Sequence, residues 1–263
     1  EVDAANDRTG GVKLADTAAE RGTPPRVLDP FCGSATALLA AQAAGAKDAA
    51  SAGVVLNLPL QQYGNIGSFL ISPDGSRVVY TAQQDTEDVY ELYSVPITGP
   101  ASSGVKLNRP LVAGAQVVDD FAISPDGSRI VYRADQEIDE VFELYSVPLQ
   151  GPATSGVKLN GGLVTGGDVR DFKISPNSRW VVYRADQDTN DVVELYSVPA
   201  TGGMPTKLNG PLDGGDVYTF LISPDSSYVV FLVDYAHLYS VPIGGGIDGR
   251  EVGGFLPDLH RVS

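Results

Sequence analysis

Three segments of the chain carry acidic side chains at close spacing, a pattern that can hold a hard cation. They begin at Gln83 (QQDTEDVYE), Asp135 (DQEIDEVFE) and Asp186 (DQDTNDVVE). In the last two, every second residue carries an oxygen donor, which is the spacing found in calcium-binding loops. The sequence therefore makes calcium a candidate cofactor, with two candidate ligand sets: Asp135, Glu137 and Asp139, and Asp186, Asp188 and Asn190.

A second interpretation of these segments is a solvated hairpin tip. Asp191 stands at the sixth position of the third segment, where calcium loops have glycine, and the first segment begins with Gln83 instead of an acid. Charges at a hairpin tip also keep a sheet edge from pairing with another chain. Both interpretations stay open at this point, and the residue pattern favours the hairpin tip.

Other groups that could carry chemistry are few. His237 and His260 are the only histidines, too few for a zinc site unless carboxylates supply the remaining ligands. The serines recur in every unit of a repeat, which fits turns and strand edges, and no Gly-x-Ser-x-Gly elbow occurs. Cys32 is the single cysteine and cannot form an intrachain disulfide. We therefore expect no catalytic residues and no enzyme activity.

The elements that must position these residues come from a repeat of about fifty residues. A segment of the form FxISPDGSxxVY begins at Phe69 and Phe121, and variants of it begin at Phe172 (FKISPNSRWVVY) and Phe220 (FLISPDSSYVVF). Each copy is followed by LYSVP, at Leu92, Leu144, Leu195 and Leu238. The first three copies continue to KLN, at Lys106, Lys158 and Lys207. A period of this length indicates a repeat architecture in which each unit is one supersecondary structure.

Each unit has the pattern of four short antiparallel strands. Apolar residues with two-residue alternation mark the strands, and Pro and Gly mark the turns between them. In the first unit, strands are predicted near 69–71, 78–80, 92–95 and 105–107. The second strand is apolar on both faces, as a sheet packed between two neighbouring sheets requires. Four such strands make one propeller blade.

The repeated ISPDGS and LYxV segments resemble the WD-repeat-like blades of TolB-type β-propellers, over about residues 53–253. The resemblance implies an all-β β-propeller of four-stranded antiparallel blades that binds partners at its faces. It implies a periplasmic or extracellular protein, or the non-catalytic domain of a serine peptidase, and no catalytic residue. Propellers of this family commonly have six or seven blades. This chain has four clear units, at 69–112, 121–164, 172–213 and 220–255, and a fifth degenerate blade is the alternative.

The sequence leaves open how the array of blades is completed at its two ends. GVVLNLPL at Gly53 repeats GVKLNRPL at Gly104, so an equivalent of the fourth strand precedes the first full unit. It completes the blade after Leu238 and closes a small ring, or it ends a degenerate blade that begins near Val27. In a third interpretation the array stays open, and neighbouring subunits cover its edges in an oligomer or filament.

The first 52 residues are rich in alanine, and we expect a partly helical segment that acts as an extension, a plug or a degenerate blade. Residues 27–47 (VLDPFCGSATALLAAQAAGAK) are similar to the first motif of class I S-adenosylmethionine-dependent methyltransferases. That resemblance implies a cofactor loop in which Asp29 receives polar groups of the cofactor. Ala35 replaces a motif glycine, no NPPY motif follows, and blades occupy the rest of the chain. We expect a remnant or a fortuitous match.

Composition narrows the classes of partner. Of 263 residues, 33 are acidic and 18 basic, giving a formal charge of −15, which argues against nucleic acid as a partner. The longest apolar stretch, residues 35–46, is too short to span a membrane. We expect an extracellular or periplasmic, non-catalytic scaffold or structural subunit with protein partners, which self-associates through blade edges or the N-terminal segment. The alternative is a ligand- or peptide-binding propeller or an accessory domain of a hydrolase.

Overall fold

The computed structural model describes residues 53–212 and 215–246. Every described residue belongs to one unit of the chain, Ser51–Ser263. The expected N-terminal helix and the methyltransferase-like segment at 27–47 lie outside the described residues, as do His260 and residues 247–255, the predicted end of the fourth blade.

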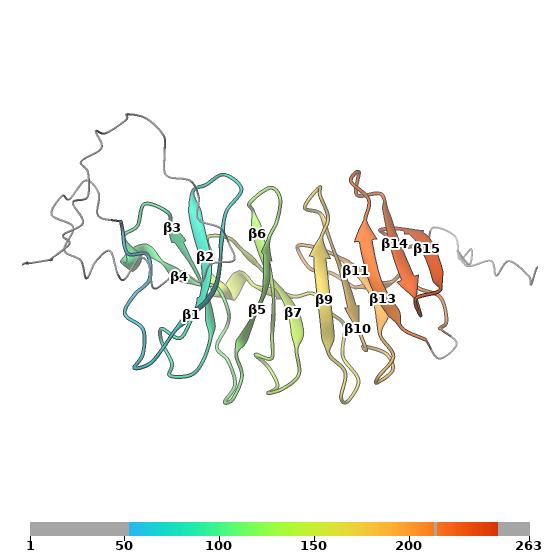
Figure 1. The fold of residues 1–263 in the computed structure, drawn as a ribbon, viewed down its shortest axis with the longest axis horizontal. Coiled ribbons are helices and arrows are strands. Elements are labelled where there is room, and N and C mark those ends of the chain that lie inside the picture. The colour runs from blue at the N-terminus through green and yellow to red at the C-terminus, as the bar shows by residue number, and fades with distance from the viewer. Residues whose placement is uncertain (1–52, 213–214, 247–263) are drawn as a thin grey trace, which may run out of the picture. The chain divides into compact units, whose positions relative to one another are not determined.

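Four antiparallel sheets make up the described part of the chain, and we number them as blades 1 to 4 in chain order, from blue to red in Figure 1. Within each blade, consecutive strands pair side by side. The strands are β1 (Ile66–Ile71), β2 (Arg77–Ala82), β3 (Glu91–Pro96) and β4 (Val105–Lys106) in blade 1; β5 (Val117–Ile123), β6 (Arg129–Ala134), β7 (Glu143–Pro148) and β8 (Val157–Lys158) in blade 2; β9 (Val169–Ile174), β10 (Trp180–Ala185), β11 (Glu194–Pro199) and β12 (Thr206–Lys207) in blade 3; and β13 (Val217–Ile222), β14 (Tyr228–Val233) and β15 (His237–Pro242) in blade 4.

The turn between the first two strands of a blade is built by its own side chains. In blade 1, Asp74 Oδ1 accepts the Ser72 hydroxyl at 2.6 Å and the backbone N–H of Ser76 at 3.0 Å. Gly75 has φ +68°, a conformation that glycine adopts without strain. Asp126 accepts equivalent hydrogen bonds in blade 2. The recurring aspartates of this motif therefore have the structural role that their repetition predicts.

The blades pack against one another through both faces of their central strands. Because side chains alternate along a strand, Val79 and Leu92 of blade 1 face blade 2, whereas Tyr80 and Tyr93 face the other way. Clusters of buried apolar side chains join blade 1 to blade 2, blade 2 to blade 3 and blade 3 to blade 4. The structure confirms the prediction of an all-β, propeller-type array of antiparallel blades.

Helix is almost absent from the described residues. Two short 3-10 turns, η1 (Ala101–Ser103) and η2 (Ala153–Ser155), precede the fourth strands of blades 1 and 2. Within residues 53–212 and 215–246, no helix is long and apolar enough to cross a membrane.

Candidate functional site

The third acidic segment, in blade 3, is held in place by its first aspartate. Asp186 is fully buried, and its Oδ1 accepts the backbone N–H of Asp168 at 2.7 Å. Its Oδ2 lies 2.9 Å from Nη2 of Arg170. Asp188 and Asn190, by contrast, are exposed. Of the three predicted ligands, the buried one therefore has both oxygens engaged by the protein, and the other two face solvent.

The second acidic segment, in blade 2, likewise has one buried acid followed by exposed ones. Asp135 is buried, and its two oxygens accept the backbone N–H groups of Gln116 at 2.7 Å and Glu140 at 3.0 Å. Glu137 and Asp139 are exposed. The first acid of each segment thus fixes the hairpin to the preceding chain, and only the residues that follow it form the solvated tip that the sequence predicted.

Neither predicted ligand set gathers into a metal site in the part of the chain that the structure describes. No group of three or more His, Cys, Asp or Glu side chains there is arranged to hold a metal ion. A calcium ion at these segments would have to replace hydrogen bonds that now satisfy a buried carboxylate, which costs free energy. Calcium binding stays a prediction of the sequence.

Behind each acidic tip lies an ion cluster that the sequence did not reveal. In blade 1, Nζ of Lys106 lies 2.7 Å from Glu91 Oε1 and 2.6 Å from Asp85 Oδ2, and the Tyr93 hydroxyl donates to Glu91 at 3.0 Å. Blades 2 and 3 repeat the cluster with Glu143, Lys158, Glu137 and Tyr145, and with Glu194, Lys207, Asp188 and Tyr196. Two predicted calcium ligands, Glu137 and Asp188, therefore pair with lysines.

The cluster links the third and fourth strands of its blade. Glu91 is the first residue of β3 and only 5% exposed, and Lys106 is the last residue of β4. Burial lowers the pKa of Lys106, but its hydrogen bonds to Asp85 and Glu91 and the charges of these two carboxylates together raise the pKa by more, so the net pKa is raised. Burial and the charge of Glu91 raise the pKa of Tyr93. The signal that could have identified this cluster was the Glu before LYSVP and the Lys of KLN, which occur together in each of the first three units.

Blade 4 lacks the cluster among its described residues. His237 takes the place of the glutamate at the start of the third strand, and the hairpin that would carry the second acid is five residues shorter. His237 is the first residue of β15 and is exposed. Tyr239 of blade 4 is only half-buried, whereas the equivalent Tyr93, Tyr145 and Tyr196 are buried.

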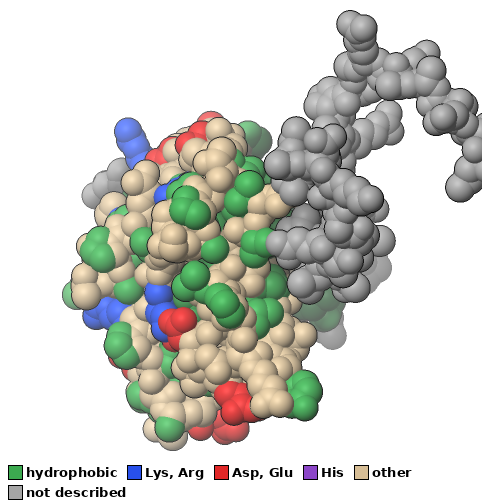
Figure 2. Space-filling view, turned by 90° about the vertical axis from the view of Figure 1, so that its left-hand side faces the viewer, with side chains coloured by type: hydrophobic (Ala, Val, Ile, Leu, Met, Phe, Trp, Pro, Cys, Tyr) green, Lys and Arg blue, Asp and Glu red, His purple; other side chains and the backbone are tan. Residues whose placement is uncertain are grey.

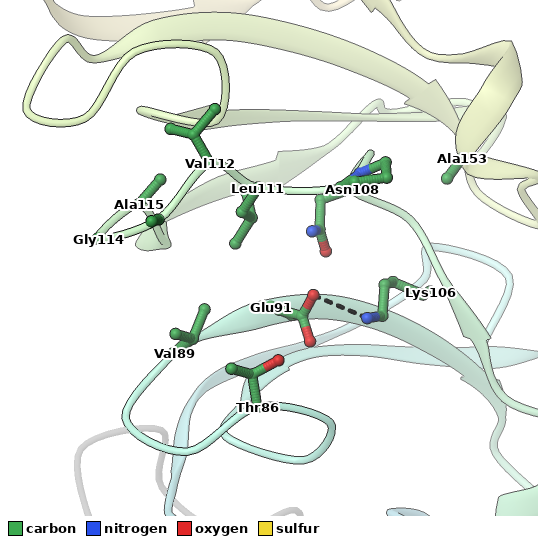
Figure 3. A pocket seen from close by; sticks show the side chains of 12 residues that line it. Thr86, Val89, Glu91, Lys106, Asn108, Leu111, Val112, Gly114, Ala115 and Ala153 are labelled. Atoms are coloured by element: carbon green, nitrogen blue, oxygen red, sulfur yellow. Dashed lines mark hydrogen bonds and ion pairs between the residues drawn. The ribbon is translucent and has the colours of Figure 1, made fainter.

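A hollow of about 600 Å³ opens between blades 1 and 2 (Figure 3). The chain from Pro110 to Ala115 forms one wall, and Thr86 and Val89 of the acidic hairpin form the opposite wall. The Glu91–Lys106 ion pair lies between these walls. The combination of apolar walls with one ion pair suits a short peptide or a small amphipathic molecule better than a charged ligand.

The two ends of the described row of blades expose apolar side chains at positions that are buried between blades. The first aromatic of each repeat is buried in blades 2, 3 and 4, where the preceding blade covers it: Phe121 is 8% exposed, Phe172 9% and Phe220 2%. Phe69 of blade 1 is 56% exposed, and Ile71 beside it 48%. In Figure 2, which views the molecule from the blade 1 side, hydrophobic side chains are scattered over this face.

The opposite end shows the same effect on the other face of the blade. The leucine of LYSVP is fully buried in blades 1 to 3, at Leu92, Leu144 and Leu195, because the next blade covers it. In blade 4, Leu238 is 72% exposed and Leu221 65%. The far face of blade 4 and the near face of blade 1 therefore match the two halves of an interface that occurs three times inside the molecule.

Comparison with known proteins gives the fold a context. No family model and no curated protein matches the chain. Among solved structures, it is similar to a TolB-type protein from Agrobacterium tumefaciens, with 19% identity, a TM-score of 0.46, and coverage of 73% of this chain and 66% of that one. It is also similar to the tricorn protease, with 17% identity, a TM-score of 0.49, and coverage of 68% of this chain and 16% of that one. For prolyl oligopeptidase B from Galerina marginata the identity is 11% and the TM-score 0.48, with coverage of 69% of this chain and 27% of that one. The chain thus spans less than two thirds of each of these proteins, and the blade assignment rests on its own strand pairing.

Proposed function

We propose that this protein is a non-catalytic, exported β-propeller-type module that works as a structural subunit and associates head to tail through its two terminal blade faces. One observation carries the proposal. Phe69 and Leu238 occupy positions that are buried in every internal blade interface, and they are exposed at the two ends of the described row of blades. Exposed apolar patches at such ends mark an interaction surface.

The repeat supplies both halves of the contact in one molecule. At each internal interface, the valine and leucine of one blade and the aromatic of the next share a buried cluster, for example Val79, Leu92 and Phe121. The same residue types face outward at the ends, as Val230 and Leu238 in blade 4 and Phe69 in blade 1. A contact between unlike patches is heterologous, so it generates rings or open filaments of copies.

Sedimentation velocity over a range of protein concentrations tests this proposal. The wild-type mass should rise above that of the 263-residue monomer, whereas Phe69→Asp alone and Leu238→Asp alone should each stay monomeric, because every copy then lacks one of the two faces. Ile138→Asp is the matched control, because Ile138 is 60% exposed but lies at a hairpin tip away from both ends. The control variant should behave as the wild type does.

Mixing the two end variants gives the sharpest result. A Phe69→Asp chain keeps a good blade 4 face, and a Leu238→Asp chain keeps a good blade 1 face, so together they should form a dimer that cannot grow. A two-fold contact between like faces would give no such capped mixed dimer. A wild-type protein that stays monomeric at every concentration would overturn the proposal.

The hollow between blades 1 and 2 favours a second candidate function, the binding of a short apolar peptide. Leu111 and Val112 line it, and Val112 is 40% exposed. Screening a peptide library against the wild type and against Val112→Asp by fluorescence polarisation tests this function. Binders that ignore the substitution, or no binders at all, would dispose of it.

A further inference from the structure

Arg109 marks a place in blade 2 that holds a guanidinium group. This residue follows the fourth strand of blade 1, and its Nη2 donates to the carbonyl oxygens of Gly156 at 2.6 Å and Thr154 at 3.4 Å. Both carbonyls belong to the 3-10 turn η2 and the residue that ends it. Burial raises the pKa of Tyr132, and the charge of Arg109 opposes this rise, so the guanidinium lies close to the tyrosine. Blade 2 therefore contains a guanidinium site that the chain fills with its own arginine.

Blade 1 has the same backbone acceptors. Ser102 stands in η1 where Thr154 stands in η2, and each turn is three residues long. The residue that ends the turn is Gly104, with φ −66° and ψ 147°, in blade 1 and Gly156, with φ −68° and ψ 144°, in blade 2. Because the two turns have the same length and nearly the same backbone angles at their ends, the carbonyls of Ser102 and Gly104 are arranged like the pair that accepts from Arg109.

The side chains around this place are equivalent in the two blades. In blade 1, the rings of Tyr80 and Tyr93 stack with their centroids 5.5 Å apart. Nζ of Lys106 lies between Glu91 and Asp85, so two carboxylates and one ammonium group leave one negative charge. A site of this charge favours a cation over an anion. Blade 2 has the same stacking distance and the same balance of charge, with residues Tyr132, Tyr145, Lys158, Glu143 and Glu137.

Blade 1 differs in the residue that would supply the guanidinium. Leu58 stands at the position of Arg109, since each follows the Leu-Asn pair of its segment. Asn57 Nδ2 donates to the carbonyl of Leu58 at 2.8 Å, and Asn108 makes the same bond in blade 2, at 3.0 Å. A leucine side chain has no hydrogen-bond donor. A hollow of about 130 Å³ lies here, and Leu58 and Gly104 are among the residues that line it.

Blade 3 has neither part of this site. Gly161 stands at the position of Arg109, and the connection between the third and fourth strands is shorter. From the end of the third strand to the lysine of KLN, the chain runs from 96 to 106 and from 148 to 158 in blades 1 and 2, but only from 199 to 207 in blade 3. No counterpart of η1 occurs in this described connection. Among blades 1 to 3, blade 1 alone combines the acceptors with a residue that cannot use them.

We propose that the hollow between Leu58 and Gly104 binds the guanidinium group of an arginine side chain from a partner polypeptide. The guanidinium donates to the carbonyls of Ser102 and Gly104, as Arg109 does to their counterparts in blade 2. Its planar fork of N–H donors suits two carbonyl acceptors, and its weak hydration lowers the cost of burial. The site is separate from the larger hollow between blades 1 and 2, although Lys106 lines both, and it does not depend on head-to-tail association.

The size of the hollow and the charge of the chain identify the occupant. A volume of about 130 Å³ corresponds to roughly four water molecules, which is room for a guanidinium and part of its stem but not for a whole arginine. The main chain of the ligand therefore stays outside, as it does for a side chain of a polypeptide. The formal charge of −15 attracts basic polypeptides. Lys106 does not exclude the guanidinium, because Lys158 occupies the same place in the blade that holds Arg109.

Isothermal titration calorimetry of the full-length chain with a blocked peptide, acetyl-Gly-Gly-Arg-Gly-Gly-amide, tests the site. The chain should bind one peptide per copy. Peptides with citrulline or lysine in place of arginine should bind at least about tenfold more weakly, because citrulline lacks the charge and lysine lacks the planar fork. Free arginine lacks the flanking main chain and should also bind more weakly. Equal binding of all three peptides would overturn the proposal, and free arginine that binds as tightly as the peptide would overturn the polypeptide partner.

Substitutions at the two equivalent positions show where the peptide binds. Leu58→Arg gives blade 1 the arginine of blade 2 and should abolish peptide binding, whereas Leu58→Gln, without a guanidinium, should keep the affinity within about twofold. Both variants should fold, because Leu58 is 40% exposed. Arg109→Leu opens the equivalent site in blade 2 and should raise the stoichiometry from one peptide to two. If Arg109→Leu melts too low to titrate, Leu58→Arg decides alone: wild-type affinity in that variant means that the peptide binds elsewhere and the proposal is wrong.

Discussion

Alanine substitution of the same leucine in two blades gives a direct measure of how open the array is. Leu195 and Leu238 occupy the same position of LYSVP, but Leu195 is fully buried between blades 3 and 4 and Leu238 is 72% exposed. Leu195→Ala removes a buried side chain from a packed cluster and should cost about 2–5 kcal/mol. Only about a quarter of Leu238 is covered, so Leu238→Ala should cost about 0.4–0.8 kcal/mol in the isolated chain.

Urea denaturation followed by tryptophan fluorescence is a suitable assay. Trp180, the only tryptophan, packs against the cluster between blades 3 and 4 that contains Leu195, so its emission reports on that interface. The measurement should be made at high dilution, where the copies of the chain are not associated with one another. At higher concentration Leu238→Ala should also lower the degree of association.

Equal destabilisation by Leu195→Ala and Leu238→Ala would refute this reasoning. If Leu238→Ala destabilises the dilute protein as much as Leu195→Ala does, the far face of blade 4 is covered within a single chain. The array would then be closed, and the head-to-tail association would be wrong. Similar costs that appear only at high concentration would instead support the association.

Three further predictions concern the interior of the blades. Asn160→Ala leaves the buried N–H of Leu144 without an acceptor and should lower the free energy of unfolding by about 1–3 kcal/mol in urea titrations; a neutral effect would contradict the capping role. Burial raises the pKa of Tyr80 to about 12, so the folded state keeps a proton that the unfolded chain loses above pH 10.0. The melting temperature should therefore decrease as the pH is raised from 10.0 to about 12, and a melting temperature that does not change over this pH range would refute the prediction. Millimolar calcium should leave the melting temperature unchanged, because both oxygens of Asp186 are already hydrogen-bonded; a rise that Asp188→Asn abolishes would favour the calcium loop predicted from the sequence.

The fold of each blade could be predicted from the sequence because its signals are local. Alternating apolar residues, the Pro-Asp-Gly turn at 73–75 and the proline that ends LYSVP each act within a few residues. The strands of blade 1 lie at the predicted places, with β2 at Arg77–Ala82 and β3 at Glu91–Pro96. Repetition of these signals in four units also indicated that sheets pack on sheets.

The parts that sequence reasoning missed depend on contacts between distant residues or on the absence of a neighbour. Lys106 and Glu91 are 15 residues apart and meet only because β4 returns beside β3. Phe69 and Phe121 begin nearly identical motifs, yet their exposure differs, because exposure is set by whether another blade precedes them. In the acidic segments, Asp186 and Asp188 differ in burial because only the former turns back onto the chain that enters the blade.

The threefold repetition of one interface also bears on how a gene for such a protein can change in length. Each unit of about fifty residues contacts the preceding and the following unit through equivalent residues. Duplication or loss of a whole unit, such as residues 121–171, therefore brings together two surfaces that already fit. The exposed Phe69 and Leu238 lie outside such an internal unit, in the first and the last described blade. Variants with three or five units should therefore retain the same pair of end surfaces, and mixed populations of different lengths could join one assembly.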